Sequence, residues 1–227
     1  MMNKAVILLS GGLDSLVALG YLIKNKKYDI KLALTFDYGQ KSVSSEIETS
    51  KKIAEFYNVK HKVIVLDWLK EITNTGLVSS MEIPTSDLGT KESAKSVWVP
   101  NRNALFLNIA ACFCDSYEYN TIIYGANKDE AGNFPDNTEE FRKQISLCFE
   151  SSTMVRPKVL APLINYSKSD IVKIAVENSM PLELVRSCYN SGDLHCGKCE
   201  SCFHLKRALK ANNCEEYIKL LFKNDEI

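Results

Sequence analysis

Residues 4–20, KAVILLSGGLDSLVALG, constrain the fold of this chain more than any other stretch. The apolar run 4–9 is typical of a strand that is buried on both faces of a parallel sheet. Two glycines interrupt the run, and Leu13, Leu16 and Val17 then return at the spacing of one helical face. The stretch therefore predicts a buried strand that passes through a tight turn directly into a helix.

The same alternation of strand and helix patterns continues along the chain. Short apolar runs predict further strands at 30–36, 61–66 and 121–124. Helical spacing predicts further helices at 47–57, 103–113 and 167–175, and a capping box opens the last of these. Strands that alternate with helices indicate an α/β fold with a doubly wound parallel sheet, as in Rossmann-like proteins.

The length and the local composition predict two unequal parts. At 227 residues, the chain suits one sizeable core, since single cores extend to about 250 residues. Residues 1–180 carry the strand and helix pattern, and within them the Ser-, Thr- and Lys-rich segment 67–100 is predicted to be an insertion or lid. Residues 181–227 are predicted to form a metal-binding C-terminal segment that ends in a short amphipathic helix.

The charge balance and the hydropathy argue against several classes of partner. Lys plus Arg and Asp plus Glu both number 28, so bulk charge does not favour a polyanion, and we expect no stable nucleic-acid binding. No window approaches the roughly 18 uninterrupted apolar residues of a membrane span. The first residues also lack the small-residue cleavage site of a signal peptide. We therefore expect a cytoplasmic protein that has no membrane partner.

The turn after the first predicted strand is expected to bind phosphate. Gly11 and Gly12 permit close backbone approach, so several N–H groups can converge on an anion at the positive end of the following helix. Ser10 and Ser15 add hydroxyl donors, whereas the lysine of a Walker-type loop is missing. The alternative is that the glycines only make a tight turn. The predicted nucleotide contacts are Leu8, Leu9, Ser10, Gly11, Gly12, Leu13, Asp14, Ser15, Leu16, Val17 and Ala18.

Half of the eight cysteines lie close together near the end of the chain. Cys188, Cys196, Cys199 and Cys202 have the spacing C-x7-C-x2-C-x2-C. In a chain that we expect to be cytoplasmic, such clustering favours a metal site over disulfides. Four thiolates can surround one tetrahedral ion and leave it no open position, which predicts a structural site. Zinc, an iron–sulfur cluster and free thiols are the candidates.

The stretch SGGLDS at 10–15 resembles the pyrophosphate-loop signature of the ATP pyrophosphatases. These enzymes cleave ATP between its α and β phosphates and adenylate a carboxylate or a carbonyl-like oxygen. The resemblance implies ATP with Mg²⁺ as the bound nucleotide. It also implies that Asp14 holds the magnesium ion or orients the loop.

Seven further motifs narrow the resemblance to the 7-cyano-7-deazaguanine synthase (QueC) family. In the family's order, over roughly residues 5–205, they are DYGQ at 37–40, VPNRN at 99–103, GAN at 125–127, FPD at 134–136, APL at 161–163, SK at 167–168 and the terminal cysteines. The family uses ATP and ammonia to convert 7-carboxy-7-deazaguanine, a small-molecule acid, through an activated acyl species and an amide to the nitrile that leads to queuosine. The resemblance implies an adenine nucleotide alpha hydrolase-like fold, structural zinc and, as in many members, a homodimer.

The resemblance also implies roles for individual residues. The implied catalytic residues are Asp14, Arg102 and Lys168, of which the two cations suit a pocket that takes a carboxylate. The implied substrate-binding residues are Tyr38, Gln40, Arg102, Asn103 and Asp136. The implied zinc ligands are Cys188, Cys196, Cys199 and Cys202. The alternative for Arg102 and Lys168 is that each is an ordinary surface charge.

Three departures from the family pattern lie on the substrate side. The chain has FPDNT at 134–138 where the family usually has Tyr-Pro-Asp-Cys-Arg, Leu205 where an arginine is expected, and Arg186-Ser187 before Cys188 in place of Thr-x-Ser. An alternative function is therefore a relative that activates a deazaguanine or another acid and stops at an amide or joins it to a different amine. A second alternative is tRNA thiolation with Cys112 and Cys114 as catalytic cysteines, although buried small residues are the commoner explanation for cysteines in an apolar helix.

Overall fold

The fold is built on a five-stranded parallel sheet in the computed structural model, which describes residues 3–223. The strands are β1 (Asn3–Leu8), β2 (Tyr28–Asp37), β3 (Lys60–Val65), β4 (Thr121–Ile123) and β5 (Lys158–Leu160). They lie in the order β3-β2-β1-β4-β5, with every neighbouring pair parallel. This arrangement confirms the predicted doubly wound sheet. Residues 1–2 and 224–227 of the two predicted domain ranges lie outside the described residues.

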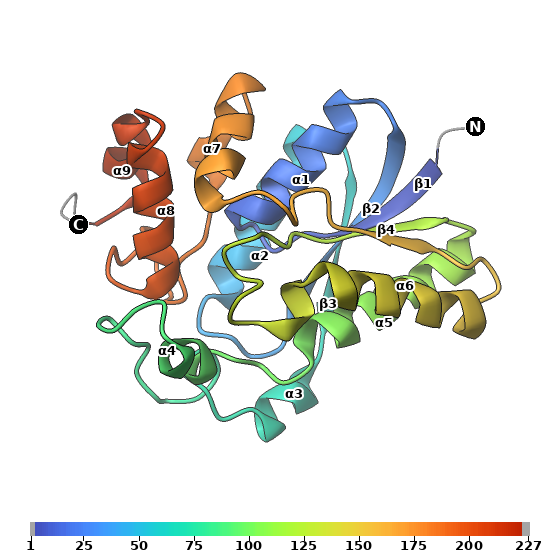
Figure 1. Cartoon of the computed structure of the whole chain (residues 1–227), viewed down its shortest axis with the longest axis horizontal. Helices are drawn as coiled ribbons and strands as arrows, with labels where there is room; N and C mark the ends of the chain where they lie inside the picture. The colour runs from blue at the N-terminus through green and yellow to red at the C-terminus, as the bar shows by residue number, and fades with distance from the viewer. Residues whose placement is uncertain (1–2, 224–227) are drawn as a thin grey trace.

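Each central strand is buried on both faces, which explains the continuous apolar runs in the sequence. In β1, Ala5 and Ile7 pack into one core, and Val6 and Leu8 pack into the other. The first core is covered by α1 (Leu13–Lys24), α2 (Val43–Phe56) and α7 (Lys168–Glu177). The second is covered by α5 (Arg102–Tyr117) and α6 (Glu139–Ser152). Figure 1 shows α1 and α7 on one side of the sheet and α5 and α6 on the other.

The strand order reverses at β1, which pairs with β2 on one side and with β4 on the other. In open α/β sheets, ligands bind at such a point, beyond the carboxyl ends of the strands. The turn after β4 lies against the start of α1, because a Cβ on Gly125 would be 2.8 Å from the Ser15 amide nitrogen. The two turns therefore form one continuous edge of the sheet.

The segment 67–100 connects β3 to α5 and contains α3 (Asp67–Ile72) and α4 (Lys91–Ser96). Leu77, Val97 and Val99 anchor it in the second core. It is also held by the C-terminal part of the chain, since the Glu200 carboxylate accepts hydrogen bonds from Gly89 N–H at 2.9 Å and from Ser93 Oγ at 2.8 Å. Figure 1 shows α4 below the C-terminal part of the chain.

The last part of the chain packs beside α7 (Figure 1). Its elements are the 3₁₀ turn η2 (Leu182–Leu184), α8 (Glu200–Lys210) and α9 (Glu215–Leu221); a further 3₁₀ turn, η1 (Pro135–Asn137), precedes α6. Leu205, Leu209 and Ile218 share the first core with α1 and α7. The C-terminal segment is therefore held to the sheet by apolar packing.

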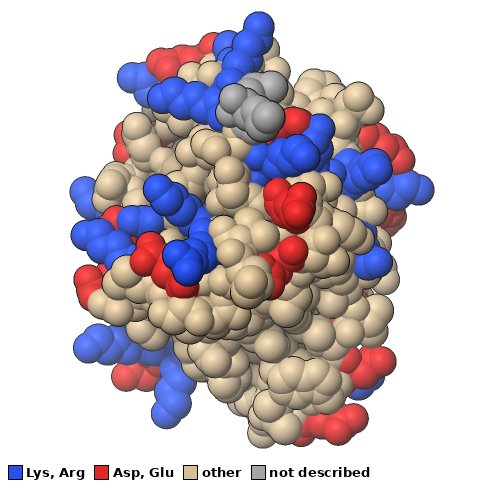
Figure 2. All heavy atoms as spheres, turned by 90° about the vertical axis from the view of Figure 1, so that its right-hand side faces the viewer, with Lys and Arg blue, Asp and Glu red and all other residues tan. Residues whose placement is uncertain are grey.

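The surface and the helices bear on the kinds of partner. On the face that Figure 2 shows, lysines and arginines are interspersed with acidic residues, and neither sign covers the face. Within residues 3–223, no helix combines the length and the apolar character that crossing a membrane requires.

Candidate active site

A cavity of about 220 Å³ opens beyond the carboxyl ends of β1 and β2 and beside the turn after β4. The predicted nucleotide contacts that line it are Leu8, Leu9, Ser10, Gly12, Leu13, Asp14 and Ser15. Leu16, Val17 and Ala18 are fully buried in the core below, and Gly11 packs against α2. The cavity thus brings together the loop and the first turn of α1.

The loop between β1 and α1 is closed by its own serine hydroxyls. Gly12 N–H donates to Ser10 Oγ at 3.3 Å, and Ser15 Oγ donates to the Gly12 carbonyl at 3.1 Å. Gly11 has a φ of +77°, and a Cβ there would lie 2.9 Å from Thr49 Cγ2, so the position requires glycine. Gly12 caps α1 without any side-chain acceptor, which leaves the first amides of the helix available to an anion.

Lys168 lies between two carboxylates at the wall of the cavity. Its Nζ is 2.5 Å from Asp14 Oδ2 and 2.9 Å from Glu130 Oε1. The capping box of Ser167 and Asp170 fixes the start of α7 and so directs this side chain. Burial by itself would lower the pKa of Lys168, but the two facing carboxylates outweigh it and raise that pKa above its ordinary value. Lys168 is therefore a fixed cation rather than a proton carrier.

Asp14 has one engaged and one unengaged carboxylate oxygen. Oδ2 accepts from Lys168 and from Asn127 Nδ2, the latter at 3.2 Å. Oδ1 is buried and has no hydrogen-bond partner among the described residues. Burial raises the pKa of Asp14, and Lys168 opposes this effect. A free carboxylate oxygen on the rim of an anion-binding loop is the kind of ligand that Mg²⁺ prefers, so the residues fit a magnesium ion that accompanies a nucleotide.

Arg102 and Tyr38 form a second polar group at the cavity. Arg102 Nη1 donates to the Tyr38 hydroxyl at 3.0 Å, and the guanidinium carbon lies 5.8 Å from the centre of the tyrosine ring. Both residues line the cavity, as does Asn103. The Asn103 amide donates to Asp136 Oδ2 at 3.4 Å. Burial raises the pKa of Asp136, and the Arg102 charge opposes this effect.

Asp136 faces a smaller cavity of about 50 Å³ that adjoins the first. The two cavities share Arg102, Glu130, Asn137 and Tyr189. Trp98 of the 67–100 segment also lines the smaller cavity, and its ring stacks on Phe134 at 5.7 Å between centroids. The predicted substrate residues Arg102 and Asp136 thus lie at the junction of the two spaces.

Gln40 lines neither cavity. Its amide group donates to the Phe36 carbonyl at 2.9 Å and to Glu46 at 2.8 Å, and its oxygen accepts from Tyr38 N–H at 3.0 Å. All of these bonds lie within the turn that follows β2 and the start of α2. Gln40 therefore fixes the backbone that carries Tyr38.

Several side chains at the cavity were not predicted from the sequence. Among them are Glu46, Glu130, Tyr189 and Arg186. Glu46 is half-buried, its desolvation raises its pKa, and it accepts from Ser42 Oγ at 2.6 Å. In the sequence, Glu46 stands in a polar helix and resembles a solvated residue. Only the packing of α2 against the Gly11 turn brings it to the cavity.

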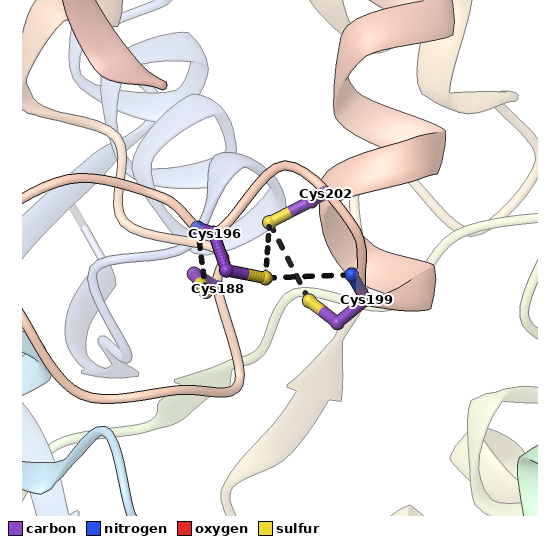
Figure 3. Close-up of side chains that lie close together, drawn as sticks. All are labelled: Cys188, Cys196, Cys199 and Cys202. Atoms are coloured by element: carbon purple, nitrogen blue, oxygen red, sulfur yellow. Dashed lines mark hydrogen bonds between the residues drawn. The ribbon is translucent and has the colours of Figure 1, made fainter. Parts of the chain in front are cut away.

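The four clustered cysteines converge on one point, as Figure 3 shows. Their Sγ atoms all lie within 4.8 Å of one another. Main-chain amides donate to the sulfurs, among them Cys196 N–H to Cys188 Sγ at 3.3 Å and Lys198 N–H to Cys196 Sγ at 3.4 Å. Gly197 has a φ of +75°, which shapes the tight turn between two of the ligands. Converging thiols surrounded by amide donors fit a tetrahedral metal ion.

His195 lies next to the clustered cysteines in the sequence, whereas Cys112 and Cys114 lie in α5. His195 Nε2 accepts from Ser187 N–H at 2.9 Å, which helps to fix the chain between the metal site and the cavity. Cys114 is buried in α5, with its Sγ directed at the Thr121 carbonyl, while Cys112 is exposed. Neither of the two α5 cysteines lines either cavity.

Comparison with solved structures supports the same fold. The chain is similar to a 4-thiouridine synthetase in complex with RNA and bound ATP, with a TM-score of 0.52, 19% identity and coverage of 96% of this chain and 52% of that one. It is also similar to the U34-tRNA thiolase NcsA of Methanococcus maripaludis with its [4Fe-4S] cluster, with a TM-score of 0.51, 14% identity and coverage of 96% and 70%. At these identities the likeness shows the fold alone.

Sequence comparison is much more specific. The 7-cyano-7-deazaguanine synthase of Methanosarcina barkeri is 46% identical over 218 residues, which are 91% of this chain and 94% of that protein. That of Carboxydothermus hydrogenoformans is 46% identical over 217 residues, or 93% and 100% of the two chains. The family model described as "Queuosine biosynthesis protein QueC" matches residues 4–213. The chain therefore belongs to the QueC family, as its ordered motifs predicted.

Proposed function

We propose that the protein is an ATP-dependent 7-cyano-7-deazaguanine synthase of queuosine biosynthesis. One observation carries the proposal: in a chain 46% identical to proteins of that name, the anion-binding loop opens into the same cavity as Arg102 and Lys168. The loop suits the phosphates of ATP, and the Arg102 guanidinium suits the carboxylate of an acid. The substrates are then ATP, ammonia and 7-carboxy-7-deazaguanine.

The reaction needs two activations because a carboxylate resists ammonia. In the first, a carboxylate oxygen attacks the α-phosphorus of ATP, the bond to the bridging oxygen breaks, and pyrophosphate leaves. Ammonia then attacks the acyl carbon, AMP leaves, and one proton is lost to give the amide. In the second, the amide oxygen attacks a new ATP, pyrophosphate leaves, and departure of AMP with loss of the two nitrogen protons gives the nitrile.

The residues divide these tasks by position. We assign the phosphates to the loop amides and to Ser10 and Ser15, with Asp14 Oδ1 as the side-chain ligand of Mg²⁺, which supplies positive charge at the phosphates. Lys168 favours the ionised form of the Asp14 carboxylate and orients it. Arg102 receives the substrate carboxylate.

The remaining substrate-binding residues lie around Arg102 and Tyr38. The Tyr38 ring offers an aromatic surface for the planar heterocycle, and Gln40 acts through Tyr38 by fixing its backbone. Asn103 and Asp136 close the far end of the pocket, where Asp136 accepts from the Asn103 amide.

We propose zinc as the metal ion of the cysteine cluster. Cys188, Cys196, Cys199 and Cys202 would hold it in a closed tetrahedral site with no position for substrate. Its contribution is structural: it joins the chain around 188–199 to the start of α8. Metal analysis of the purified protein distinguishes one zinc from an iron–sulfur cluster, which would also absorb visible light.

The setting of the enzyme follows from the same proposal. We assign it to the cytoplasm, where ATP and ammonia are available, and to a homodimer. The equal numbers of basic and acidic residues in the sequence, which are interspersed on the face in Figure 2, support a protein that forms no stable complex with nucleic acid. Sedimentation and a tRNA-binding assay test these assignments.

Mass spectrometry of the product tests the proposed function. The protein is incubated with ATP, 7-carboxy-7-deazaguanine and ¹⁵N-ammonium, and we expect a ¹⁵N-labelled nitrile with two AMP and two pyrophosphate released for each nitrile. A matched mixture with 7-deazaguanine, which has no carboxylate, should release no AMP. An amide as the end product would limit the activity to the first activation, and no pyrophosphate release with the acid would refute the proposal.

A further inference from the structure

Arg186 is a buried cation at the cavity, and it has no role in the steps assigned to Asp14, Lys168 and Arg102. Its side chain is 5% exposed and lines the cavity together with the anion-binding loop. Its backbone also touches that loop, because Arg186 N–H donates to the Gly11 carbonyl at 2.8 Å. A Cβ on Gly12 would lie 3.9 Å from the Arg186 carbonyl oxygen. Arg186 therefore lies directly beside the two glycines of the loop.

The guanidinium group is held in place but is not fully bonded. Nε donates to Ser45 Oγ on α2 at 3.2 Å, and Nη2 donates to the Asn190 carbonyl at 2.6 Å. Nη1 is buried and has no hydrogen-bond partner among residues 3–223. A guanidinium group stays charged and only donates hydrogen bonds, so a buried free Nη1 is costly until an acceptor arrives.

None of the other charged groups described at the cavity accepts a hydrogen bond from Arg186 Nη1. Glu46 is the acid whose pKa the Arg186 charge influences, but its two oxygens accept from Ser42 and Gln40. Lys168 is already paired with two carboxylates. Arg186 thus offers a fixed, unshared positive donor beside the phosphate end of the loop.

We infer that Arg186 Nη1 binds a β- or γ-phosphoryl oxygen of ATP and then holds the departing pyrophosphate. This inference rests on the proposed function, in which the Gly11–Gly12 turn receives those phosphates. Positive charge there offsets the charge that gathers on pyrophosphate as the bond to the α-phosphorus breaks. Arg186 lies two residues before Cys188, the first cysteine of the cluster, so the segment that carries the cysteines also contributes to nucleotide binding.

Calorimetric titration of Arg186→Gln with ATP, pyrophosphate and AMP tests the inference. Loss of a charge-assisted hydrogen bond should weaken ATP and pyrophosphate binding by about 10- to 100-fold. AMP lacks the β and γ phosphates, so its affinity should stay within about twofold of wild type. Arg186→Lys, which keeps the charge but loses the planar fork, should show the same selectivity with a smaller loss.

Two control variants separate this role from a structural one. Arg142→Gln removes an arginine that lies outside the cavity and binds Glu139 and the Val159 carbonyl, so it should leave all three affinities unchanged. Ser45→Ala removes one support of the guanidinium group but keeps its charge, so it should weaken ATP less than Arg186→Gln does. The metal content and melting temperature of each variant are measured alongside, and Arg186→Lys replaces Arg186→Gln if the latter does not fold.

The outcomes distinguish failure of this inference from failure of the proposed function. If ATP and AMP weaken equally, Arg186 only supports the pocket, and the inference is overturned. It is also overturned if ATP and pyrophosphate bind normally while the KM of the acid rises, because Arg186 then binds the substrate carboxylate. Wild-type protein that binds neither ATP nor pyrophosphate refutes the proposed function and this inference together.

Discussion

Replacement of Gly125 by alanine tests whether the turn after β4 fixes the anion-binding loop. A Cβ at this position would lie 2.8 Å from the Ser15 amide nitrogen and 3.0 Å from the Asp14 carbonyl carbon. Both neighbours are backbone atoms of the first turn of α1, so the methyl group can be admitted only if that turn moves. Overpacking of this kind costs about 1–3 kcal/mol. For a chain of this size, each kcal/mol lowers the melting temperature by about 2–4 °C.

The same movement displaces the groups that we assign to the phosphates. We therefore expect Gly125→Ala to weaken ATP binding, measured by calorimetric titration, in addition to lowering the melting temperature. Gly132→Ala is the matched control, because a Cβ at Gly132 meets no atom within 4 Å. Its melting temperature should equal or slightly exceed that of wild type. If the two variants melt and bind ATP alike, the close approach at Gly125 does not position the loop and our reasoning is wrong.

Three further predictions concern charge, pH and the metal. Lys168→Gln should lower pyrophosphate release by about 100-fold, since fixed charge at such sites contributes that much to rate; an unchanged rate would make Lys168 structural only. Burial, and to a lesser degree the charge of Lys51, lowers the pKa of His61. The unfolded chain therefore takes up this proton at a higher pH than the folded chain, and the free energy of unfolding should fall as the pH drops below about 6.5. Urea titrations of His61→Gln at several pH values should lack this fall. Metal chelation should increase hydrogen exchange over 87–96, where Glu200 binds the insertion, and Glu200→Ala should do so with the metal retained.

The sequence predicted the sheet because its central strands carry their own signal. A strand buried on both faces must be apolar throughout, and the runs at 4–9 and 30–36 mark β1 and β2 directly. The three residues of β5 give no such signal, since a strand so short is defined by its pairing with β4 rather than by its own pattern. α6 was not predicted either, although Phe141, Ile145 and Phe149 recur in it at helical spacing and pack into the second core.

The site could be predicted where its functional residues lie close together in the sequence. The loop and the four cysteines are local motifs, so their spacing alone indicated an anion site and a metal site. Glu46, Glu130 and Arg186 reach the cavity from three distant segments, and their positions there depend on tertiary packing that no spacing encodes. Gln40 illustrates the converse, because only the structure shows that its amide is fully occupied within its own turn.

The position of the four clustered cysteines explains how a closed metal site, which has no position for substrate, could serve the cavity beside it. The chain from 185 to 198 forms neither helix nor strand, yet it carries Arg186 and Tyr189 on the cavity wall. Ordering an irregular segment costs conformational entropy, so constraints at its two ends help to hold the buried guanidinium group in place. A metal ion at the four cysteines would supply such a constraint at one end of the segment, and the bond from Arg186 N–H to the Gly11 carbonyl supplies one at the other. The ion would also fix the start of α8, where Glu200 accepts hydrogen bonds from the insertion that lines the smaller cavity. Loss of the metal should therefore weaken the phosphate end and the substrate end of the site together, although the ion touches neither substrate.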